Sequence, residues 1–330
     1  MRRRDFIKVV TGSAMAWPLA AHAQQGDRMR LIGVLMGWPE SDPHAPSSLA
    51  AFRDALAKLG WREGNNIRTE LRWGAPDPDR MKTLAKELVD RQPDAIFSQT
   101  TPAISALARE TRTIPIVFAL VSDPIGSGFS ASLAHPRGNI TGFTGNDPAI
   151  GGKWMELLKE IAPRTARVAL LSNPATAPQL QFYMPSIKAT ASSVAVEVSV
   201  AQVHAREEIE AVIAAQAHTP GGGLIVTPDA FTTANCDLII ALATRYKVPA
   251  IFNEPLYAQL GGLIAYGTDI AELFRQAAEY IDRVLKGDKP GELPIQQPTK
   301  YELVINLKTA KALGLTIPES VLSLADKVIE

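Results

Sequence analysis

Short apolar runs alternate with segments of helical periodicity along the sequence, and the alternation restarts halfway along the chain. Runs such as RLIGVLM and IPIVFALV are apolar throughout, as strands buried on both faces of a parallel sheet are. Between such runs, Leu49, Phe52 and Leu56 recur at helical spacing. A second series of the same kind begins at ARVALLSNP. Strands that alternate with helices predict an α/β fold in which helices cover both faces of each parallel sheet.

The two series predict two doubly wound, Rossmann-like α/β lobes, at residues 29–145 and 146–268. Residues 269–330 follow the second series, and they hold an amphipathic helix, a proline-rich stretch and the extended run YELVINLK. We expect this last segment to cross back between the lobes. Several crossings make a hinge, and a hinge between two α/β lobes makes a cleft that can close.

Residues 1–23 have the three-part pattern of an export signal, with a basic start, an apolar run and Ala-His-Ala before Gln24. RRDFIK resembles the bacterial twin-arginine (Tat) signal, and a glycine and a proline make the apolar run too irregular for a spanning helix. We expect cleavage near Ala23-Gln24 and a periplasmic location. The residue after the predicted cleavage site is not a cysteine, so a lipid anchor is not expected. The alternative is an amphipathic helix of the mature domain.

The composition is that of a globular chain and argues against several function classes. The 330 residues are 46% hydrophobic and include 34 basic and 34 acidic residues. Removal of residues 1–23 takes away four basic residues and one acidic residue, which leaves a net charge of −3. No basic surface for nucleic acid is therefore expected. The single cysteine, Cys236, cannot form an intramolecular disulfide, and we expect neither a metal nor a cofactor.

The sequence lacks the motifs of several common enzyme classes. No GxGxxG follows the first apolar run, and neither a GxxxxGK[ST] phosphate loop nor a GxSxG nucleophile elbow occurs. The five histidines are scattered and form no HxH or HExxH pair. We therefore expect a protein that is not an enzyme. An enzyme whose reactive groups meet only in the fold stays an alternative, and a titratable cluster in the cleft would favour it.

Polar loops follow the apolar runs, and ligands of open α/β sheets bind outside the carboxyl ends of the strands. In the loop SQTTP, Thr101 fits a helix N-cap and Pro102 fits the first helical position. The free amides and partial positive charge of such a helix N-terminus suit a ligand carboxylate. The alternative is that Thr100 and Thr101 only cap the helix.

Acidic side chains in other loops are candidates for binding a ligand ammonium. Asp123 and Asp229 fit this role, although each also fits as the cap of the turn that follows it, and Glu254 is a third candidate. Trp38 follows the first apolar run and suits either stacking on a ligand ring or packing in the core. The candidate binding residues are Trp38, Thr100, Thr101, Ser122, Asp123, Asn173, Asp229 and Glu254.

In their order and spacing, these loops resemble the ABC transporter solute-binding family whose better-known members bind tryptophan, tyrosine or phenylalanine. The resemblance covers about Arg30 to Glu330 and is carried by TTPAISAL, VSDPIGSGF, NITGF, TPDAFTT and INLKTAKALGL. GGKWMELLKEIAP is similar to a proteobacterial branch whose ligands are mostly unassigned. The resemblance implies the periplasmic-binding-protein type I fold with three crossings between its lobes. It also implies a membrane permease and an ATPase as partner chains.

The resemblance also implies roles for individual residues. Thr100 and Thr101 match a hydroxyl pair that takes the amino-acid carboxylate, Ser122 and Asp123 match an [ST]-D-P loop, and Asp229 matches an acidic ammonium partner. The loops GWPESDPHA and SNPATAP depart from the family pattern, and both shape the side-chain pocket. The ligand's side chain is therefore not predicted. We expect a monomeric receptor that closes on an amino acid or related carboxylate and delivers it to an importer. The alternative is a sensory protein of the same fold that signals to a membrane kinase or chemoreceptor.

Overall fold

The computed structural model describes residues 28–74 and 77–330, so the predicted export signal lies outside the described residues. Among the residues that it describes, no helix combines the length and the apolar character needed to cross a membrane.

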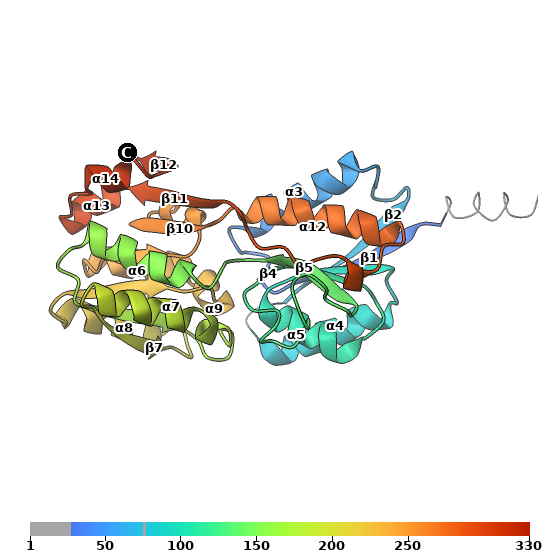
Figure 1. Ribbon diagram of the computed structural model, residues 1–330, viewed down its shortest axis with the longest axis horizontal. Helices are drawn as coiled ribbons and strands as arrows, with labels where there is room; N and C mark the ends of the chain where they lie inside the picture. Colours follow the sequence, from blue (N-terminus) through green and yellow to red (C-terminus); the bar gives the residue numbers. More distant parts are fainter. Residues whose placement is uncertain (1–27, 75–76) are drawn as a thin grey trace, which may run out of the picture.

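The first lobe is a five-stranded parallel sheet with the order β2-β1-β3-β4-β5 (Figure 1). Its strands and helices are β1 (Arg30–Met36), α3 (Ala45–Lys58), β2 (Ile67–Trp73), α4 (Pro78–Asp90), β3 (Ala95–Gln99), α5 (Thr101–Glu110), β4 (Ile116–Val121) and β5 (Ile140–Thr144). All five residues of β3 and of β5 are buried. The central strand β3 and the edge strand β5 are therefore both covered on both faces.

The second lobe is a seven-stranded sheet with the order β12-β11-β10-β9-β8-β6-β7, in which only β10 and β11 pair antiparallel. Its strands are β6 (Arg167–Ser172), β7 (Glu197–Gln202), β8 (Gly222–Val226), β9 (Ala250–Phe252), β10 (Ile264–Thr268), β11 (Tyr301–Asn306) and β12 (Lys327–Ile329). Its helices are α6 (Ile150–Ile161), α7 (Leu180–Ser193), α8 (Glu208–His218), α9 (Ala230–Ala234), α10 (Cys236–Arg245), α11 (Pro255–Gln259), α13 (Leu307–Leu313) and α14 (Glu319–Leu322).

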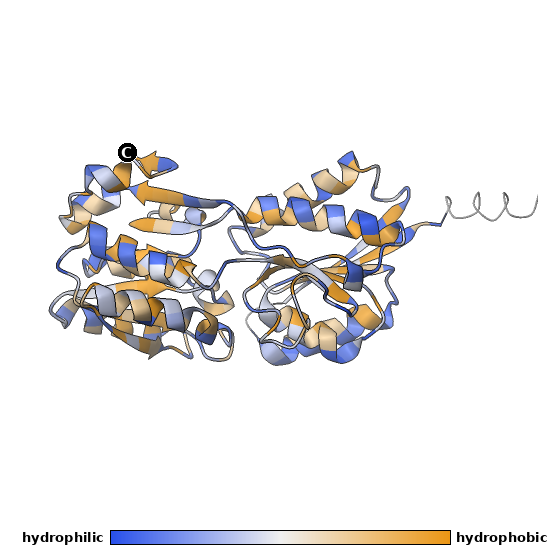
Figure 2. Ribbon diagram, viewed as in Figure 1, coloured by the Kyte–Doolittle hydropathy of each residue, from blue (hydrophilic) through white to orange (hydrophobic). Residues whose placement is uncertain are grey.

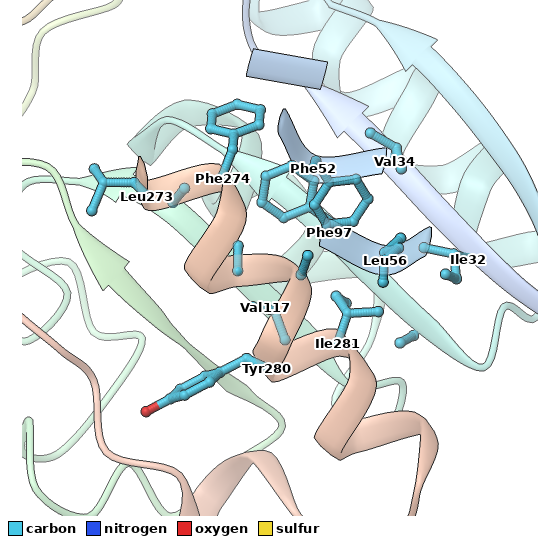
Figure 3. Close-up of a cluster of buried hydrophobic side chains, with 14 of the residues drawn as sticks. Ile32, Val34, Phe52, Leu56, Phe97, Val117, Leu273, Phe274, Tyr280 and Ile281 are labelled. Atoms are coloured by element: carbon cyan, nitrogen blue, oxygen red, sulfur yellow. The ribbon is translucent and has the colours of Figure 1, made fainter. Parts of the chain in front are cut away.

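Helix α12 (Ile270–Leu285) follows the second lobe in sequence but packs on the first. Figure 1 shows it beside α3, and it also contacts β3, β4 and β5. In the core beneath it, the Phe97 ring stacks on Phe52 at 4.4 Å and meets Phe274 edge-on at 5.0 Å (Figure 3). After the short helix η1 (Pro290–Glu292) the chain returns to the second sheet as β11. The chain thus passes between the lobes after β5, after β10 and after η1.

Each lobe has its own apolar core on both faces of its sheet. In the first lobe, one cluster lies between the sheet and helices α3 and α12, and another lies between the sheet and helices α4 and α5. Two further clusters cover the two faces of the second sheet. Figure 2 shows the strands as mostly hydrophobic, while the helices carry hydrophilic residues as well. The predicted fold class, two doubly wound lobes joined by a hinge of several crossings, is confirmed.

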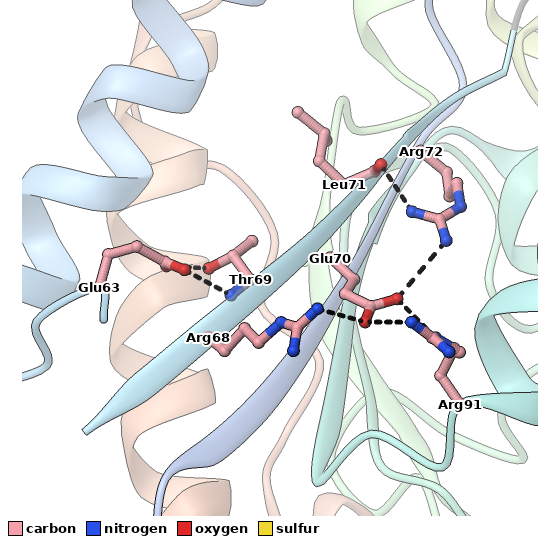
Figure 4. Close-up of polar contacts among 7 residues, drawn as sticks. All are labelled: Glu63, Arg68, Thr69, Glu70, Leu71, Arg72 and Arg91. Atoms are coloured by element: carbon pink, nitrogen blue, oxygen red, sulfur yellow. Dashed lines mark hydrogen bonds and ion pairs between the residues drawn. The ribbon is translucent and has the colours of Figure 1, made fainter. Parts of the chain in front are cut away.

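The edge strand β2 carries a cluster of charges rather than an open apolar edge (Figure 4). The Glu70 carboxylate accepts hydrogen bonds from Nε of Arg91 at 3.0 Å and from Nη2 of Arg91 at 3.1 Å. Arg68 and Arg72 approach the same carboxylate. The hydrogen bonds from Arg91 lower the pKa of Glu70. Charged side chains on an edge strand oppose pairing with a strand of another molecule.

Candidate ligand-binding site

A space of about 540 Å³, counted with the solvent at its mouth, lies between the two lobes. The residues that line it are Trp38, Thr100, Thr101, Pro102, Leu120, Ser122, Gly145, Asn146, Thr176, Gln179, Pro228, Asp229, Ala230, Thr233, Asn253, Glu254, Thr268 and Ile270. Both lobes and two of the crossings therefore contribute to the lining, and we call this space the interlobe site.

Six of the eight candidate residues line the interlobe site: Trp38, Thr100, Thr101, Ser122, Asp229 and Glu254. They follow strands β1, β3, β4, β8 and β9, in agreement with the rule that ligands bind at the carboxyl ends of strands. Sequence reasoning missed Thr176, Thr233 and Asn253, although all three lie in or beside loops that it singled out. Asn146 and Gln179 were missed as well, because no motif marks them.

Thr100 and Thr101 do not cap α5 in the predicted way. The helix begins at Thr101, and the preceding residue, Thr100, makes no side-chain capping hydrogen bond. Capping requires extended backbone at the N-cap, whereas Thr100 has φ of 73°. The hydroxyl oxygens of both threonines are buried and have no hydrogen-bond partner in the part of the chain that the structure describes. The prediction that Thr101 is the N-cap is therefore corrected, and the two hydroxyls are left free to bind something in the interlobe site.

Two residues with strained backbone lie where strands of the first lobe meet the interlobe site. Thr100 and Leu120 both line the site, and both have positive φ, at 73° and 58°. Such a conformation costs about 1–3 kcal/mol in a residue other than glycine, and the surrounding structure must enforce it. Gly37 leaves room for the Thr100 side chain, because a Cβ atom there would lie 2.1 Å from Oγ1 of Thr100. Strain of this kind clusters at functional sites.

Asp229 places a buried carboxylate in the second-lobe wall of the interlobe site. Its Oδ1 accepts hydrogen bonds from the Phe231 N–H at 2.9 Å and from the Thr176 hydroxyl, and its Oδ2 accepts one from the Asn173 N–H at 2.7 Å. Burial raises the pKa of Asp229, and these hydrogen bonds oppose the rise without cancelling it. A positive group in the site would compensate this buried carboxylate.

Asp123 and Asn173 do not line the interlobe site. Oδ1 of Asp123 accepts a hydrogen bond from the Gly126 N–H at 2.7 Å, so Asp123 makes the turn-capping contact that was its alternative role. The Asn173 side chain accepts one from the Ala175 N–H at 2.9 Å. Asn173 therefore acts on the site through its backbone, which holds Asp229.

Two side-chain contacts join the lobes around the site. Tyr183 of the second lobe donates a hydrogen bond to Oγ of Ser122 at 2.8 Å, and its ring is fully buried. Burial raises the pKa of the Tyr183 hydroxyl, which keeps this group neutral. Glu254 of the second lobe pairs with His44 of the first, and its other oxygen accepts from Nδ2 of Asn253 at 3.2 Å. The lobes are thus in contact across the cleft.

The charges of the lining are unbalanced. Among the described residues that line it, Asp229 and Glu254 are the only charged ones, and none is a lysine, arginine or histidine. A ligand carboxylate must therefore rely on hydroxyls and helix amides, while a ligand ammonium finds a carboxylate. Among residues 28–74 and 77–330, no group of three or more His, Cys, Asp or Glu side chains is arranged to hold a metal ion.

Comparison with known proteins agrees with this geometry. The model of a family described as ABC transporter substrate binding protein matches residues 41–329. The tyrosine-binding protein of Clostridioides difficile (strain R20291) is 26% identical over 273 residues, which are 83% of this chain and 78% of that protein. Two solved structures are each 27% identical and cover 91% of this chain and 100% of their own. One is a conserved domain protein from Vibrio cholerae with a TM-score of 0.85, and the other, with 0.84, is an ABC domain in complex with L-Trp from Streptococcus pneumonia.

Proposed function

Because the chain belongs to the ABC transporter substrate binding protein family, we propose that it is the receptor of an importer and closes its lobes on an amino acid or a closely related zwitterion. One observation carries this proposal. Two buried hydroxyls without partners and a buried carboxylate line the same interlobe site, from opposite lobes. A zwitterion carries one anionic and one cationic group, so it complements both walls at once.

The first lobe would bind the ligand carboxylate. The hydroxyls of Thr100 and Thr101 each supply one donor, and the first amides of α5 add a partial positive charge. No cationic side chain is needed, because hydroxyls and amides together can satisfy a buried carboxylate.

The second lobe would bind the ligand ammonium through Asp229. Three hydrogen bonds hold this carboxylate in place, and two of them come from backbone N–H groups. The two charged groups of the ligand contact opposite lobes, and both contacts form only when the lobes are closed. The ligand therefore favours the closed arrangement. Binding then shifts the population toward the closed state by the difference in affinity between the two states.

Trp38 would contribute a wall rather than a stacking platform. Its ring is 2% exposed and stacks on Phe274, with 6.2 Å between ring centroids. Trp38 therefore belongs to the core of the first lobe and also lines the interlobe site.

Delivery to a membrane permease and a periplasmic location belong to the same proposal. They are supported by family membership and by the export pattern of residues 1–23. Ser122 and Tyr183, which join the lobes, would help to define the closed shape that such a permease meets.

A thermal-shift screen of residues 24–330 tests the proposal. The twenty amino acids and a set of simple carboxylic acids are added separately, and the melting temperature is measured. A ligand that binds only the folded chain adds about 2.7 kcal/mol of stability at one hundred times its Kd. We expect at least one amino acid to raise the melting temperature. If simple carboxylates raise it and no amino acid does, the zwitterion assignment is wrong.

A further inference from the structure

A histidine–carboxylate pair joins the two lobes beside the interlobe site, and the function proposed above gives it no role. His44 ends the loop between β1 and α3 in the first lobe, whereas Glu254 directly precedes α11 in the second. Nε2 of His44 forms an ion pair with Oε2 of Glu254. The two side chains are only 8% and 12% exposed.

The His44 ring is seated between aromatic rings from both lobes. The Trp38 ring of the first lobe lies 5.6 Å from it, and the Tyr257 ring of the second lobe meets it edge-on at 5.5 Å. Separation of the lobes would therefore break the ion pair and remove one wall of the ring's packing at the same time. The complete environment of His44 exists only while the lobes are together.

The groups around His44 favour its charged form. Asp42 accepts a hydrogen bond from the His44 N–H, and one of its oxygens is buried without a partner. The other titratable groups nearby are Glu254, Tyr257 and Cys236, together with Asp269 and Glu302 in the hollow that His44 also lines. All the charged members are acidic.

Protonation of His44 is therefore favoured in this arrangement. Burial by itself would lower the pKa of His44, but the carboxylates of Glu254 and Asp42 reverse that effect and raise it. Burial also raises the pKa of Asp42 to about 6 and that of Cys236 to about 12, and it raises the pKa of Tyr257. The thiol and the phenol are thus neutral near pH 7.

We propose that His44 is a positioning residue for ligand capture, which as an imidazolium pairs with Glu254 only in the closed state and so ties lobe closure to protonation. The proposal rests on the lobe closure proposed above. The pair also neutralises one of the two acids of the interlobe site and leaves Asp229 as the single carboxylate for a ligand ammonium. One free carboxylate matches the one positive charge of an amino acid.

The direction of the pH dependence follows from linkage. Opening of the lobes separates His44 from Glu254, so its pKa falls back toward the ordinary value of 6.5. Since the closed state holds the proton more tightly, the extra stability of closure is fully present below about pH 6.5 and is lost as the pH rises through the raised pKa of His44. Within that window the ratio of closed to open molecules changes by up to about tenfold per pH unit.

Small-angle X-ray scattering of ligand-free residues 24–330 between pH 5.5 and 9 tests this proposal. We expect the radius of gyration of the wild type to increase as the pH rises, because the closed fraction falls. His44→Gln and Glu254→Gln should each abolish most of this change, while His218→Gln, on the exposed face of α8, should keep it. Asp42→Asn removes the titration of Asp42 itself and should keep most of this change, because Glu254 contributes more than Asp42 to the raised pKa of His44.

Two results would overturn the proposal. One is a radius of gyration of His44→Gln that depends on pH as that of the wild type does, and the other is a wild type whose radius of gyration does not change with pH. Circular dichroism of each variant reports whether it folds. If His44→Gln does not fold, Glu254→Gln tests the same ion pair independently. The scattering experiment contains no ligand, so a negative result does not contradict the proposal of an amino-acid receptor. A negative ligand screen, in turn, does not contradict a pH-dependent closure.

Discussion

At the scale of single residues, our proposal assigns the ligand carboxylate to Thr100 and Thr101. Their hydroxyls are buried without partners, and burial of an unpaired polar group costs free energy that a ligand can recover. From the sequence alone, the same two residues also fit the role of a helix cap. The positive φ of Thr100 is incompatible with the capping role and leaves the binding role. The sequence does not predict this conformation, which a β-branched residue rarely adopts.

Thr101→Val separates a binding role from a structural one. The variant keeps the shape of the side chain and removes the hydroxyl, so we expect ligand affinity to fall at least tenfold. The free energy of unfolding without ligand should stay within about 1 kcal/mol of the wild type, because no capping bond is lost. Calorimetry with an amino acid from the screen and chemical denaturation measure the two quantities. Thr113→Val, at an exposed loop position, is the matched control. Unchanged affinity in Thr101→Val would remove Thr101 from the site.

The pair of His44 and Glu254 shows the limit of sequence reasoning at this scale. Glu254 was singled out as a candidate for a ligand ammonium, yet its carboxylate already pairs with His44. The two residues lie in different lobes and far apart in sequence, so only the docked lobes reveal that they meet.

At the scale of elements, the sequence predicted most strands and helices correctly because apolar runs and helical periodicity report burial directly. It also predicted the amphipathic helix that became α12 and a crossing between the lobes. It did not predict which apolar face α12 would cover. That choice depends on the complementary surface formed by α3 and the first sheet, whose residues lie some 200 positions earlier.

Phe274→Ala tests the assignment of α12 to the core of the first lobe. Phe274 is fully buried and packs against Phe97, so we expect the free energy of unfolding to fall by about 3–5 kcal/mol in urea denaturation. Glu279→Ala, on the exposed face of the same helix, should change it by less than about 0.5 kcal/mol. A loss below 1 kcal/mol in Phe274→Ala would mean that α12 does not form part of this core in solution.

At the scale of the whole molecule, three passes of the chain make the lobes one unit with a site between them. Neither lobe holds a complete site, because the free hydroxyls lie in the first and Asp229 lies in the second. The position of the site was predictable, since it follows from the carboxyl ends of strands in both lobes. The sequence did not predict the contacts that join the lobes around the site, from Tyr183 to Ser122 and from His44 to Glu254.

The central claim is that the two lobes close on both charged ends of a zwitterion, and titration calorimetry with matched ligands tests it most directly. One amino acid from the screen is compared with its methyl ester, which lacks the carboxylate charge, and with its des-amino acid, which lacks the ammonium. Each change leaves a buried group on one wall without its partner, so we predict that each lowers the affinity of residues 24–330 at least tenfold. A des-amino acid that binds as tightly as its parent would contradict the account.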